Sequence, residues 1–312
     1  MRYNRILLLG GGGFIGQALT RRLYSKGYII HILTPEKINF SAPNIHVHSG
    51  KLDDRSIVEK VLPQCDIVFH LASATTPGDS TRSPVFEVEH NILPTIQFLT
   101  YLQKTDHIKN FIFISSGGAI YLPSSEKSLT ENQILSPKSY YGAGKVTIES
   151  FLNVFVNIHN TNVTILRPSN LYGPGQSFRH GFGLIRTMLT HILNDTTMEI
   201  WGDGEIVRDF IYIDDMINLL ELIIKTPETS GVFNVSFNKG YSIHQVKEIV
   251  EKITKKQLQV KYQPERKMDI AKVIIDSSKL KNKTGWQPVI ELEKGILKTW
   301  NWLKNQDRVH NP

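Results

Sequence analysis

The first half of the chain alternates short apolar runs with segments of helical periodicity. Runs rich in β-branched and aromatic residues predict strands at 5–9, 29–33, 45–48, 67–70, 110–115 and 162–167. Helical patterns occupy the intervals at 16–26, 55–62, 87–104 and 139–159. Residues 6–9 and 111–114 are apolar at successive positions, as expected of strands buried on both faces of a sheet. The alternation predicts βαβ units and a parallel sheet.

The pattern changes after Arg167, where Pro168, Gly173, Pro174 and Gly175 mark a long loop. Beyond it, helices, isolated strands and loops are mixed. Segments 210–213 and 232–235 have strand character, and the second is expected to return to the first sheet. We therefore predict an α/β fold with a large domain at 1–168 plus about 211–237. A smaller, mixed α/β lobe is predicted at 169–210 and 238–312.

Composition sets few further limits on a chain of 312 residues, of which 40% are hydrophobic and 21% charged. No apolar run approaches the roughly 18 residues that cross a bilayer, so no transmembrane segment is expected. The basic N-terminus leads into an apolar run that ends in four glycines, which favours a buried strand over a signal peptide. Cys65 is the only cysteine, so no intrachain disulfide can form, and a cytoplasmic location is expected.

The formal charge of +7 raises the question of a nucleic-acid or membrane partner. The lysines are scattered, mostly over the last third of the chain, and no basic stripe is interleaved with aromatic residues. We therefore expect solvated helix faces and no nucleic-acid partner. No metal site is expected either.

A glycine-rich loop, Gly10–Gly16, follows the first predicted strand and opens a helix. In the pattern G-x-x-G-x-x-G, Gly10 permits a tight turn, Gly13 lets a pyrophosphate approach the backbone, and Gly16 lets the helix pack closely on the sheet. The helix N-terminus offers N–H groups and a partial positive charge to phosphates. The large domain is therefore predicted to be a Rossmann-type, doubly wound dinucleotide-binding domain, and the lobe to bind the substrate.

The end of the second predicted strand leaves the choice between NAD and NADP open. An acidic residue at this place usually binds the adenosine ribose, but Thr34 occupies it. A hydroxyl does not repel a 2′-phosphate as a carboxylate would, and Lys37 is nearby. Glu36 is an alternative ligand for the ribose. NAD is the first expectation and NADP the second.

Tyr141 and Lys145 form a Y-x-x-x-K pattern, which on a helix places both side chains on one face, with Cβ atoms about 5–6 Å apart. Oxidation of a carbinol by hydride loss requires a base for the hydroxyl proton. Tyrosine, with a pKa near 10, is a poor base at neutral pH, and a neighbouring ammonium together with the positive nicotinamide ring is expected to lower that pKa. We therefore predict that Tyr141 is the catalytic acid and base and that Lys145 assists it.

The predicted strand at 110–115 runs into Ser115, Ser116 and Gly117. Ligands bind at the carboxyl edge of such sheets, so a serine here is expected to contact the reacting sugar oxygen or the cofactor. The alternative is a turn in which both serines satisfy backbone groups.

With these motifs in view, the sequence resembles the extended short-chain dehydrogenase/reductase family, in its nucleotide-sugar epimerase/dehydratase branch. The resemblance covers nearly the whole chain, through the motifs L-G-G-G-G-F-I-G (9–16), H-L-A-S (70–73), Asn91 in E-H-N-I-L-P-T, S-S-G-G-A-I-Y (115–121), Y-x-x-x-K, R-P-S-N-L-Y-G-P (167–174), W-G-D-G-E-I-V-R-D-F-I-Y-I-D-D (201–215) and Arg266, Asp269 and Asp276. It implies that Tyr141 is the acid/base and that Lys145 holds the nicotinamide ribose.

The resemblance also implies two sets of contacts. Cofactor contacts are expected from Gly10, Gly13, Phe14, Ile15, Gly16, Thr34, Leu52, Asp53, Leu71, Ala72, Ser73, Asn91, Ser115, Tyr141, Lys145 and Pro168. Substrate contacts are expected from Thr75, Ser116, Gly117, Tyr141, Asn170, Arg208, Arg266, Asp269 and Val273. The arginines suit a diphosphate, because a guanidinium grips phosphate with two parallel hydrogen bonds.

Three positions depart from the family pattern. Gly117 stands where a catalytic Ser or Thr is usual, so Ser116 is the substitute, with Ser115 behind it. Thr34 replaces the ribose-binding acid. Lys51 replaces an aspartate that contacts adenine, and Asp53 or Asp54 is expected to compensate.

The leading hypothesis is a UDP-sugar 4-epimerase, a homodimer paired through the helices at 87–104 and 139–159 as the resemblance implies. Val273 in place of a bulky tyrosine would leave room for a 2-acetamido group, unless it is simply a buried strand residue. The alternative is an NAD(P)H-dependent reductase of a nucleotide-linked 4-keto-6-deoxysugar. A 4,6-dehydratase is disfavoured because residues 117–119 hold no acid. The intact Tyr141 and Lys145 argue against a non-catalytic sensor.

Overall fold

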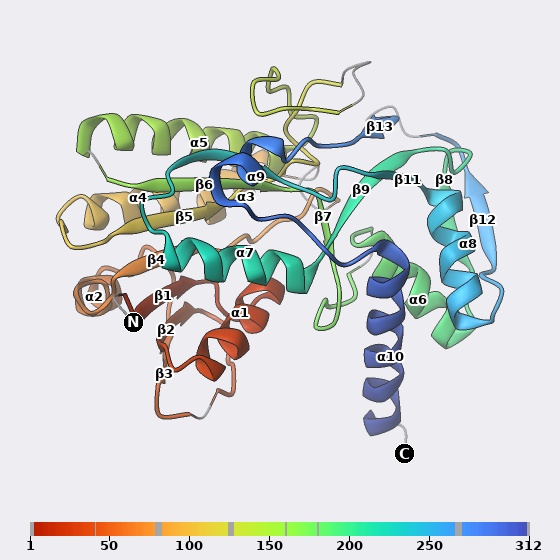
Figure 1. Cartoon of the computed structure of the whole chain (residues 1–312), viewed down its shortest axis with the longest axis horizontal. Coiled ribbons are helices and arrows are strands. Elements are labelled where there is room, and N and C mark those ends of the chain that lie inside the picture. The colour runs from red at the N-terminus through yellow and green to blue at the C-terminus, as the bar shows by residue number, and fades with distance from the viewer. Residues whose placement is uncertain are drawn as a thin grey trace. The chain divides into compact units, whose positions relative to one another are not determined.

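The computed structural model in Figure 1 describes residues 3–40, 42–78, 83–123, 128–159, 161–179, 181–265 and 270–310. The chain forms two compact units, each assembled from separate stretches. Unit 1 comprises Met1–Ile120, Leu135–Arg167 and Ile217–Phe233. Unit 2 comprises Tyr121–Ile134, Pro168–Met216 and Asn234–Pro312.

A seven-stranded sheet in the order β10-β6-β5-β4-β1-β2-β3 organises unit 1. Its strands are β1 (Arg5–Leu9), β2 (Ile29–Thr34), β3 (Ile45–Ser49), β4 (Ile67–His70), β5 (Asn110–Ile114), β6 (Val163–Pro168) and β10 (Gly231–Val235). The pairs from β3 to β6 along this order are all parallel. The chain winds outward from β1 to β3 and then returns to β4 on the other side, which confirms the Rossmann-type, doubly wound fold.

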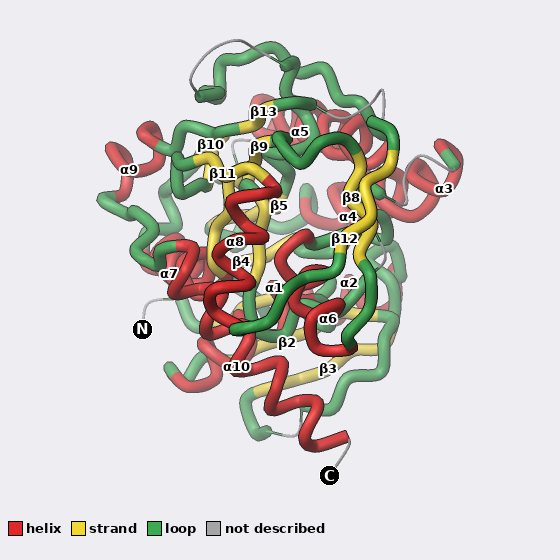
Figure 2. Tube along the Cα trace, turned by 90° about the vertical axis from the view of Figure 1, so that its right-hand side faces the viewer, coloured by secondary structure: helices red, strands yellow, loops and turns green. Residues whose placement is uncertain are grey.

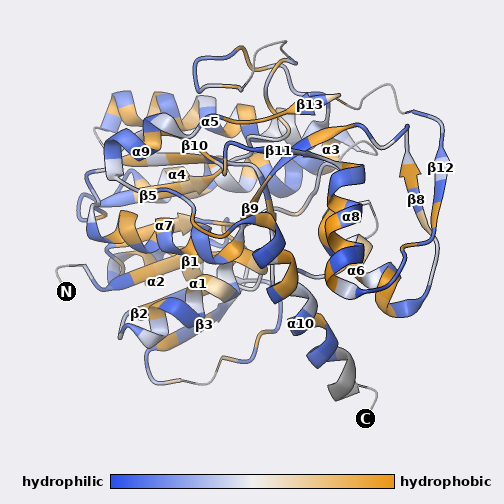
Figure 3. Ribbon diagram, turned by 45° about the vertical axis from the view of Figure 1, so that its right-hand side comes forward, coloured by the Kyte–Doolittle hydropathy of each residue, from blue (hydrophilic) through white to orange (hydrophobic). Residues whose placement is uncertain are grey.

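Helices flank this sheet at α1 (Phe14–Ser25), α2 (Arg55–Val61), α3 (Pro84–Glu87), α4 (Leu93–Leu102), α5 (Tyr140–His159) and α7 (Ile213–Lys225), with a 3₁₀ turn at Leu62–Gln64. One core cluster joins sheet residues such as Leu7 and Phe111 to Val58 of α2, Phe98 of α4 and Leu152 of α5. Figure 3 shows the hydrophobic character of β1, and the central side chains of β1 and β5 are almost fully buried.

The helix expected at 87–104 is instead three segments: α3, a π-helical turn at Val88–Ile92, and α4. Pro94 lies in the first turn of α4 and cannot donate a backbone hydrogen bond, so the helix begins anew there. The interruption places Glu87 at the end of α3, where its side chain is buried.

Unit 2 contains a second, four-stranded sheet built around β9 (Val207–Tyr212). Its other strands are β7 (Asn170–Tyr172), β11 (Gly240–Ser242) and β13 (Lys272–Val273). Figure 2 shows β8 (Met198–Trp201) and β12 (Val260–Gln263) as a separate parallel pair. The helices of this unit are α6 (Leu184–Asn194), α8 (Ile243–Thr254), α9 (Ser278–Thr284) and α10 (Leu292–His310).

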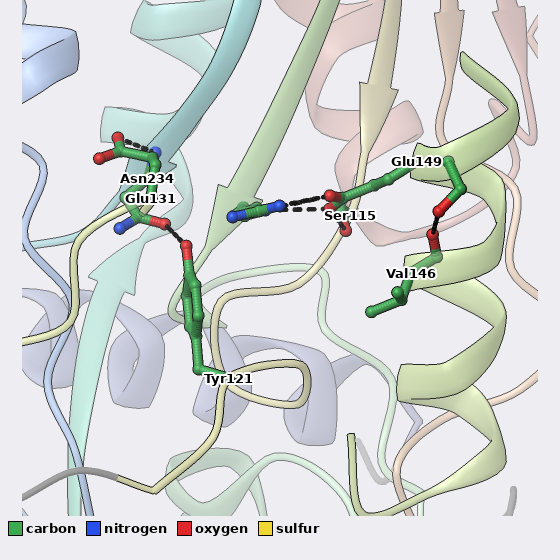
Figure 4. Close-up of polar contacts among 8 residues, drawn as sticks. Ser115, Tyr121, Glu131, Val146, Glu149 and Asn234 are labelled. Carbon is green, nitrogen blue, oxygen red and sulfur yellow. Dashed lines mark hydrogen bonds and ion pairs between the residues drawn. The ribbon is translucent and has the colours of Figure 1, made fainter. Parts of the chain in front are cut away.

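Hydrogen bonds tie distant stretches of unit 2 together. Tyr121 donates its phenol to Asn234 Oδ1 at 2.5 Å, and the backbone N–H of Asn234 donates to Glu131 at 2.8 Å (Figure 4). Over the described parts of the chain, no helix combines the length and apolarity needed to span a membrane.

Candidate active site

The glycine loop turns from β1 into α1 under tight steric limits. Gly10 has a φ of +80°, and a Cβ there would lie 2.6 Å from the Cα of Ala72. A Cβ on Gly16 would lie 2.5 Å from the Cα of Gly11. Gly13 is the N-cap of α1 and has no side chain to accept the first helical N–H groups. The loop therefore presents an uncapped helix N-terminus, which suits a phosphate. Phe14 and Ile15 begin that helix.

An acidic side chain lies against the glycine loop, two residues beyond the expected place. Thr34 is buried at the end of β2, and its hydroxyl donates to Glu36 Oε2 at 3.0 Å. A Cβ on Gly12 would lie only 2.5 Å from the same carboxylate oxygen. The backbone N–H of Glu36 lies 3.4 Å from Thr34 Oγ1. Thr34 therefore holds the Glu36 carboxylate over the loop.

Tyr141 and Lys145 lie in the first turns of α5, as their spacing predicts. Lys145 Nζ lies 5.6 Å from the centre of the Tyr141 ring and 4.9 Å from that of Phe113. It donates to the carbonyl of Ile114, at the end of β5, at 2.9 Å. Desolvation lowers the pKa of Lys145 to about 8, although Glu87 and Glu149 act to raise it. This lysine therefore titrates close to neutral pH.

Burial also dominates the acidity of Tyr141. It raises the pKa of the phenol to about 12, against a hydrogen bond with Ser116 that lowers the pKa, and the charge of Glu87 raises it further. From the sequence, the ammonium and the positive nicotinamide ring together are expected to lower this pKa. In the protein's side chains by themselves, desolvation of the phenol is the largest influence and raises it.

The two serines after β5 point to different partners. The Ser116 hydroxyl acts on Tyr141, where it lowers the pKa of the phenol. Ser115 is buried and donates its hydroxyl to Glu149 Oε1 at 2.5 Å (Figure 4). Glu149 in turn accepts hydrogen bonds from Arg167 Nε at 3.0 Å and Nη2 at 2.5 Å. The side chain of Ser115 is thus engaged with a buried ion pair, whereas Ser116 lies beside the reactive phenol.

A second polar chain lies along the loop after β4. The backbone N–H of Ala74 donates to Asn91 Oδ1 at 2.8 Å, and Asn91 Nδ2 donates to Thr75 Oγ1 at 3.0 Å. Thr75 donates to Glu87 Oε2 at 2.5 Å. Glu87 and Glu149 are residues that sequence reasoning missed. The one signal for Glu87 in the sequence was Gly144, a glycine inside the Y-x-x-x-K helix, where a side chain would collide with Glu87.

The remaining cofactor candidates of unit 1 lie in the segments that follow β3 and β4. Leu52 packs on the core cluster, and the carbonyl of Asp53 lies 3.4 Å from the hydroxyl of Tyr101. Leu71 donates its N–H to Leu9 at 2.9 Å, and Ser73 donates its hydroxyl to the carbonyl of Thr75 at 3.0 Å. Ala72 backs Gly10, as described above.

In unit 2, two substrate candidates flank Asp209. Asn170 donates to the carbonyl of Asp209 at 2.9 Å, and Arg208 Nη1 donates to the carbonyl of Ile270 at 2.6 Å. Burial raises the pKa of Asp209 to about 7. Val273 pairs in register with Arg208 and is 3% exposed, so Val273 is a buried strand residue.

Pro168 ends β6, and Arg266 and Asp269 lie outside the described residues. Within the described ranges, no cluster of His, Cys, Asp and Glu suits a metal ion.

Comparison with known proteins places this geometry in a family. The family model described as "NAD dependent epimerase/dehydratase family" matches residues 6–236. A putative UDP-glucose 4-epimerase of Methanocaldococcus jannaschii is 30% identical over 310 residues, covering 97% of this chain and 99% of that protein.

Two solved structures are similar over nearly their whole lengths. The UDP-glucose 4-epimerase of Thermotoga maritima, determined with UDP-glucose, has a TM-score of 0.89 and 30% identity, covering 96% of this chain and 99% of its own. The UDP-N-acetylglucosamine 4-epimerase of Methanobrevibacter ruminantium, in complex with UDP-N-acetylmuramic acid, has a TM-score of 0.91 and 28% identity, covering 98% and 100%. This chain belongs to the NAD-dependent epimerase/dehydratase family.

Proposed function

We propose that this protein is a UDP-sugar 4-epimerase, which inverts C4 of a UDP-hexose or UDP-N-acetylhexosamine through a 4-keto sugar. The similarity to 4-epimerases over nearly the whole chain supports this proposal. The observation that carries it is the buried Tyr141 phenol, whose pKa the neighbouring Ser116 hydroxyl lowers, with Lys145 one turn further along α5 and its Nζ 5.6 Å from the centre of the Tyr141 ring. This is the arrangement needed to move one proton to and from a sugar hydroxyl.

NAD is the cofactor that the residues of unit 1 fit. The uncapped N-terminus of α1 suits its pyrophosphate, and Glu36 lies where its adenosine ribose would need a hydrogen-bond acceptor. The same carboxylate would repel the 2′-phosphate of NADP. When bound, NAD supplies the chemistry of taking a hydride from C4 and returning it to the other face.

The chain's own residues handle the proton. Tyr141 takes the proton of the C4 hydroxyl and later returns it to the carbonyl oxygen, while Ser116 orients the phenol. Because burial raises the pKa of Tyr141 to about 12, the phenolate needs positive charge beside it, and Lys145 supplies an ammonium below a pH of about 8. Efficient turnover is therefore expected over a narrow pH range.

Unit 1 serves as the dinucleotide domain in this proposal, and unit 2 as the nucleotide-sugar lobe. Asn170 and Arg208 hold the diphosphate, and the backbone carbonyls of Asp209 and Ile270, which fix their side chains, support that role. Arg266 and Asp269 remain predictions for the diphosphate and the ribose. Holding the nucleotide rather than the hexose leaves the sugar free to present both faces.

The alternative, a 4-keto-sugar reductase that consumes NADPH, has less support. In the sequence it is favoured by Thr34 and Lys51 in place of acids that bind NAD, and against the first of these Glu36 lies over the glycine loop. The three similar proteins described above are all epimerases by name.

The outer face of α5 favours a homodimer. Phe151, Val154 and Ile158 are 44%, 55% and 68% exposed at helical spacing, and Leu93 on α4 is 51% exposed. Apolar side chains so arranged suit pairing across a two-fold axis. A cytoplasmic location is part of the same proposal.

Replacement of Tyr141 by Phe tests the function. The variant keeps the ring but loses the group that carries the proton, so interconversion of UDP-glucose and UDP-galactose should fall at least about 1,000-fold. Binding of UDP should persist, as measured by calorimetry. Retained turnover would refute the assignment, and Tyr140→Phe, an exposed neighbour, serves as the control.

A further inference from the structure

Glu87 is a buried carboxylate at the reactive pair for which the proposed chemistry has no use. It ends α3, is 3% exposed, and lies against α5 at Gly144, the residue before Lys145. A methyl group on Gly144 would overlap Glu87 Oε1. Glycine costs a helix interior about 1 kcal/mol relative to alanine, so its presence here indicates that the space is used.

The hydrogen bonds around Glu87 run in one direction. Asn91 Oδ1 accepts from a backbone N–H, which fixes its Nδ2 as the donor to Thr75 Oγ1. The hydroxyl proton of Thr75 therefore points on to Glu87 Oε2, at 2.5 Å. An oxygen that accepts so short a bond fits an ionised carboxylate. The chain of donors thus stabilises a negative charge on Glu87.

We infer that Glu87 is a positioning residue of the proton-transfer site: its carboxylate, seated on Gly144 and held by Thr75, is the fixed counter-charge of Lys145. This inference rests on the proposed function. When Tyr141 carries a phenolate, it balances the positive nicotinamide. Glu87 then balances Lys145, so the site is neutral before and after the proton moves. In a site poorly screened by water, a counter-charge lowers the cost of keeping the ammonium buried beside Tyr141.

Other titratable groups that face this site have partners or stay neutral. On α5, Glu149 is bound to Arg167, and Tyr141 and Lys145 are the reactive pair itself. On β4, burial lowers the pKa of His70 to about 3, so that it is uncharged at neutral pH. Beside Glu87, His90 is exposed and stacks on Phe86. Of the two carboxylates, Glu87 raises the pKa of both Tyr141 and Lys145, whereas Glu149 raises that of Lys145 alone.

The test is Glu87→Gln, which keeps an acceptor for Thr75 and removes the charge. In this variant, the pKa of Tyr141 and that of Lys145 should both fall, because the negative charge of Glu87 raises both. Both limbs of the pH profile of kcat/KM with UDP-glucose should move to lower pH. The ratio of kcat/KM at pH 6 to that at pH 9 should then rise about tenfold over that of the unmodified protein. Glu89→Gln makes the same change on an exposed neighbour and should leave the profile unchanged.

A second variant and a second measurement keep the inference falsifiable. Gly144→Ala should displace the carboxylate and shift the profile in the same direction. The absorbance of tyrosinate near 295 nm, taken as the difference from Tyr141→Phe with NAD present, reports the ionisation of Tyr141 without turnover. If the unmodified protein epimerises neither UDP-glucose nor UDP-N-acetylglucosamine, the proposed function fails, and this titration still decides the role of Glu87. Coincident titration curves for Glu87→Gln and the unmodified protein would overturn the inference.

Discussion

Two buried carboxylates near Lys145 are stabilised in different ways. Glu149 is 2% exposed and accepts hydrogen bonds from the guanidinium of Arg167 and from Ser115. Glu87 is 3% exposed and accepts from the neutral hydroxyl of Thr75. A carboxylate bound to a fixed cation has its charge largely neutralised in place. Glu87 is bound by a neutral hydroxyl instead, and its charge raises the pKa of both Tyr141 and Lys145, whereas that of Glu149 raises the pKa of Lys145 alone.

Asp209 in unit 2 shows what burial does to a carboxylate held by neutral donors alone. It accepts from Ser169 Oγ and from the backbone N–H of Phe237, both at 3.1 Å. Burial nevertheless raises its pKa to about 7. Hydrogen bonds from neutral groups therefore do not fully replace hydration, and the ammonium of Lys145 is the natural counter-charge for Glu87.

Removal of Arg167 should have the largest effect on stability. Arg167→Met leaves Glu149 buried with only Ser115 as a donor, and should cost about 3–5 kcal/mol in the free energy of unfolding. Urea denaturation measures this loss. Arg55→Met breaks an ion pair with Glu59 on the exposed face of α2 and should cost less than about 1 kcal/mol. Equal losses for the two variants would show that Glu149 does not depend on its cation.

The sequence predicts best those parts of the site that depend on local spacing. The glycine loop must leave β1 and enter α1 within a few residues, and Tyr141 and Lys145 must share a face because they are four residues apart on a helix. Continuous apolar runs likewise identify β1 and β5 before any contact is known. In each case the relevant geometry is confined to one or two neighbouring elements.

The parts that the sequence leaves undetermined depend on packing between distant elements. Glu87 reaches Gly144 across 57 positions of the chain, and the break in the helix that buries it depends on how α3 and α4 meet α5. Ser115 and Ser116 are adjacent in the sequence, which does not reveal that their side chains contact different partners, Glu149 and Tyr141. The sequence offered Glu36 as an alternative to Thr34, and its carboxylate lies so close to Gly12 that a side chain there would collide with it.

Thr75→Val should reduce stability less than Arg167→Met and more than Ser115→Ala. It tests how far Glu87, unlike Glu149, depends on a neutral donor. The substitution keeps the shape of the side chain but removes the donor to Glu87 and the acceptor for Asn91 Nδ2. Two buried polar groups are left unpaired, so the free energy of unfolding should fall by about 2–3 kcal/mol in urea denaturation. Thr100→Val, on the exposed surface of α4, should change it by less than about 0.5 kcal/mol. A loss no greater than that control would mean that Glu87 does not need its donor.

Ser115→Ala should have the smallest effect of the three. It also removes a 2.5 Å hydrogen bond to a buried carboxylate, but Glu149 keeps its bonds to Arg167, so the free energy of unfolding should fall by only about 1 kcal/mol. Ser150→Ala, an exposed position on the same helix whose hydroxyl bonds the carbonyl of Val146 (Figure 4), is the matched control and should be near neutral. NAD affinity, measured by calorimetry, should not change, because the hydroxyl of Ser115 points to Glu149. A larger loss than that of Thr75→Val would reverse the comparison and make Glu149 the carboxylate that depends on neutral donors.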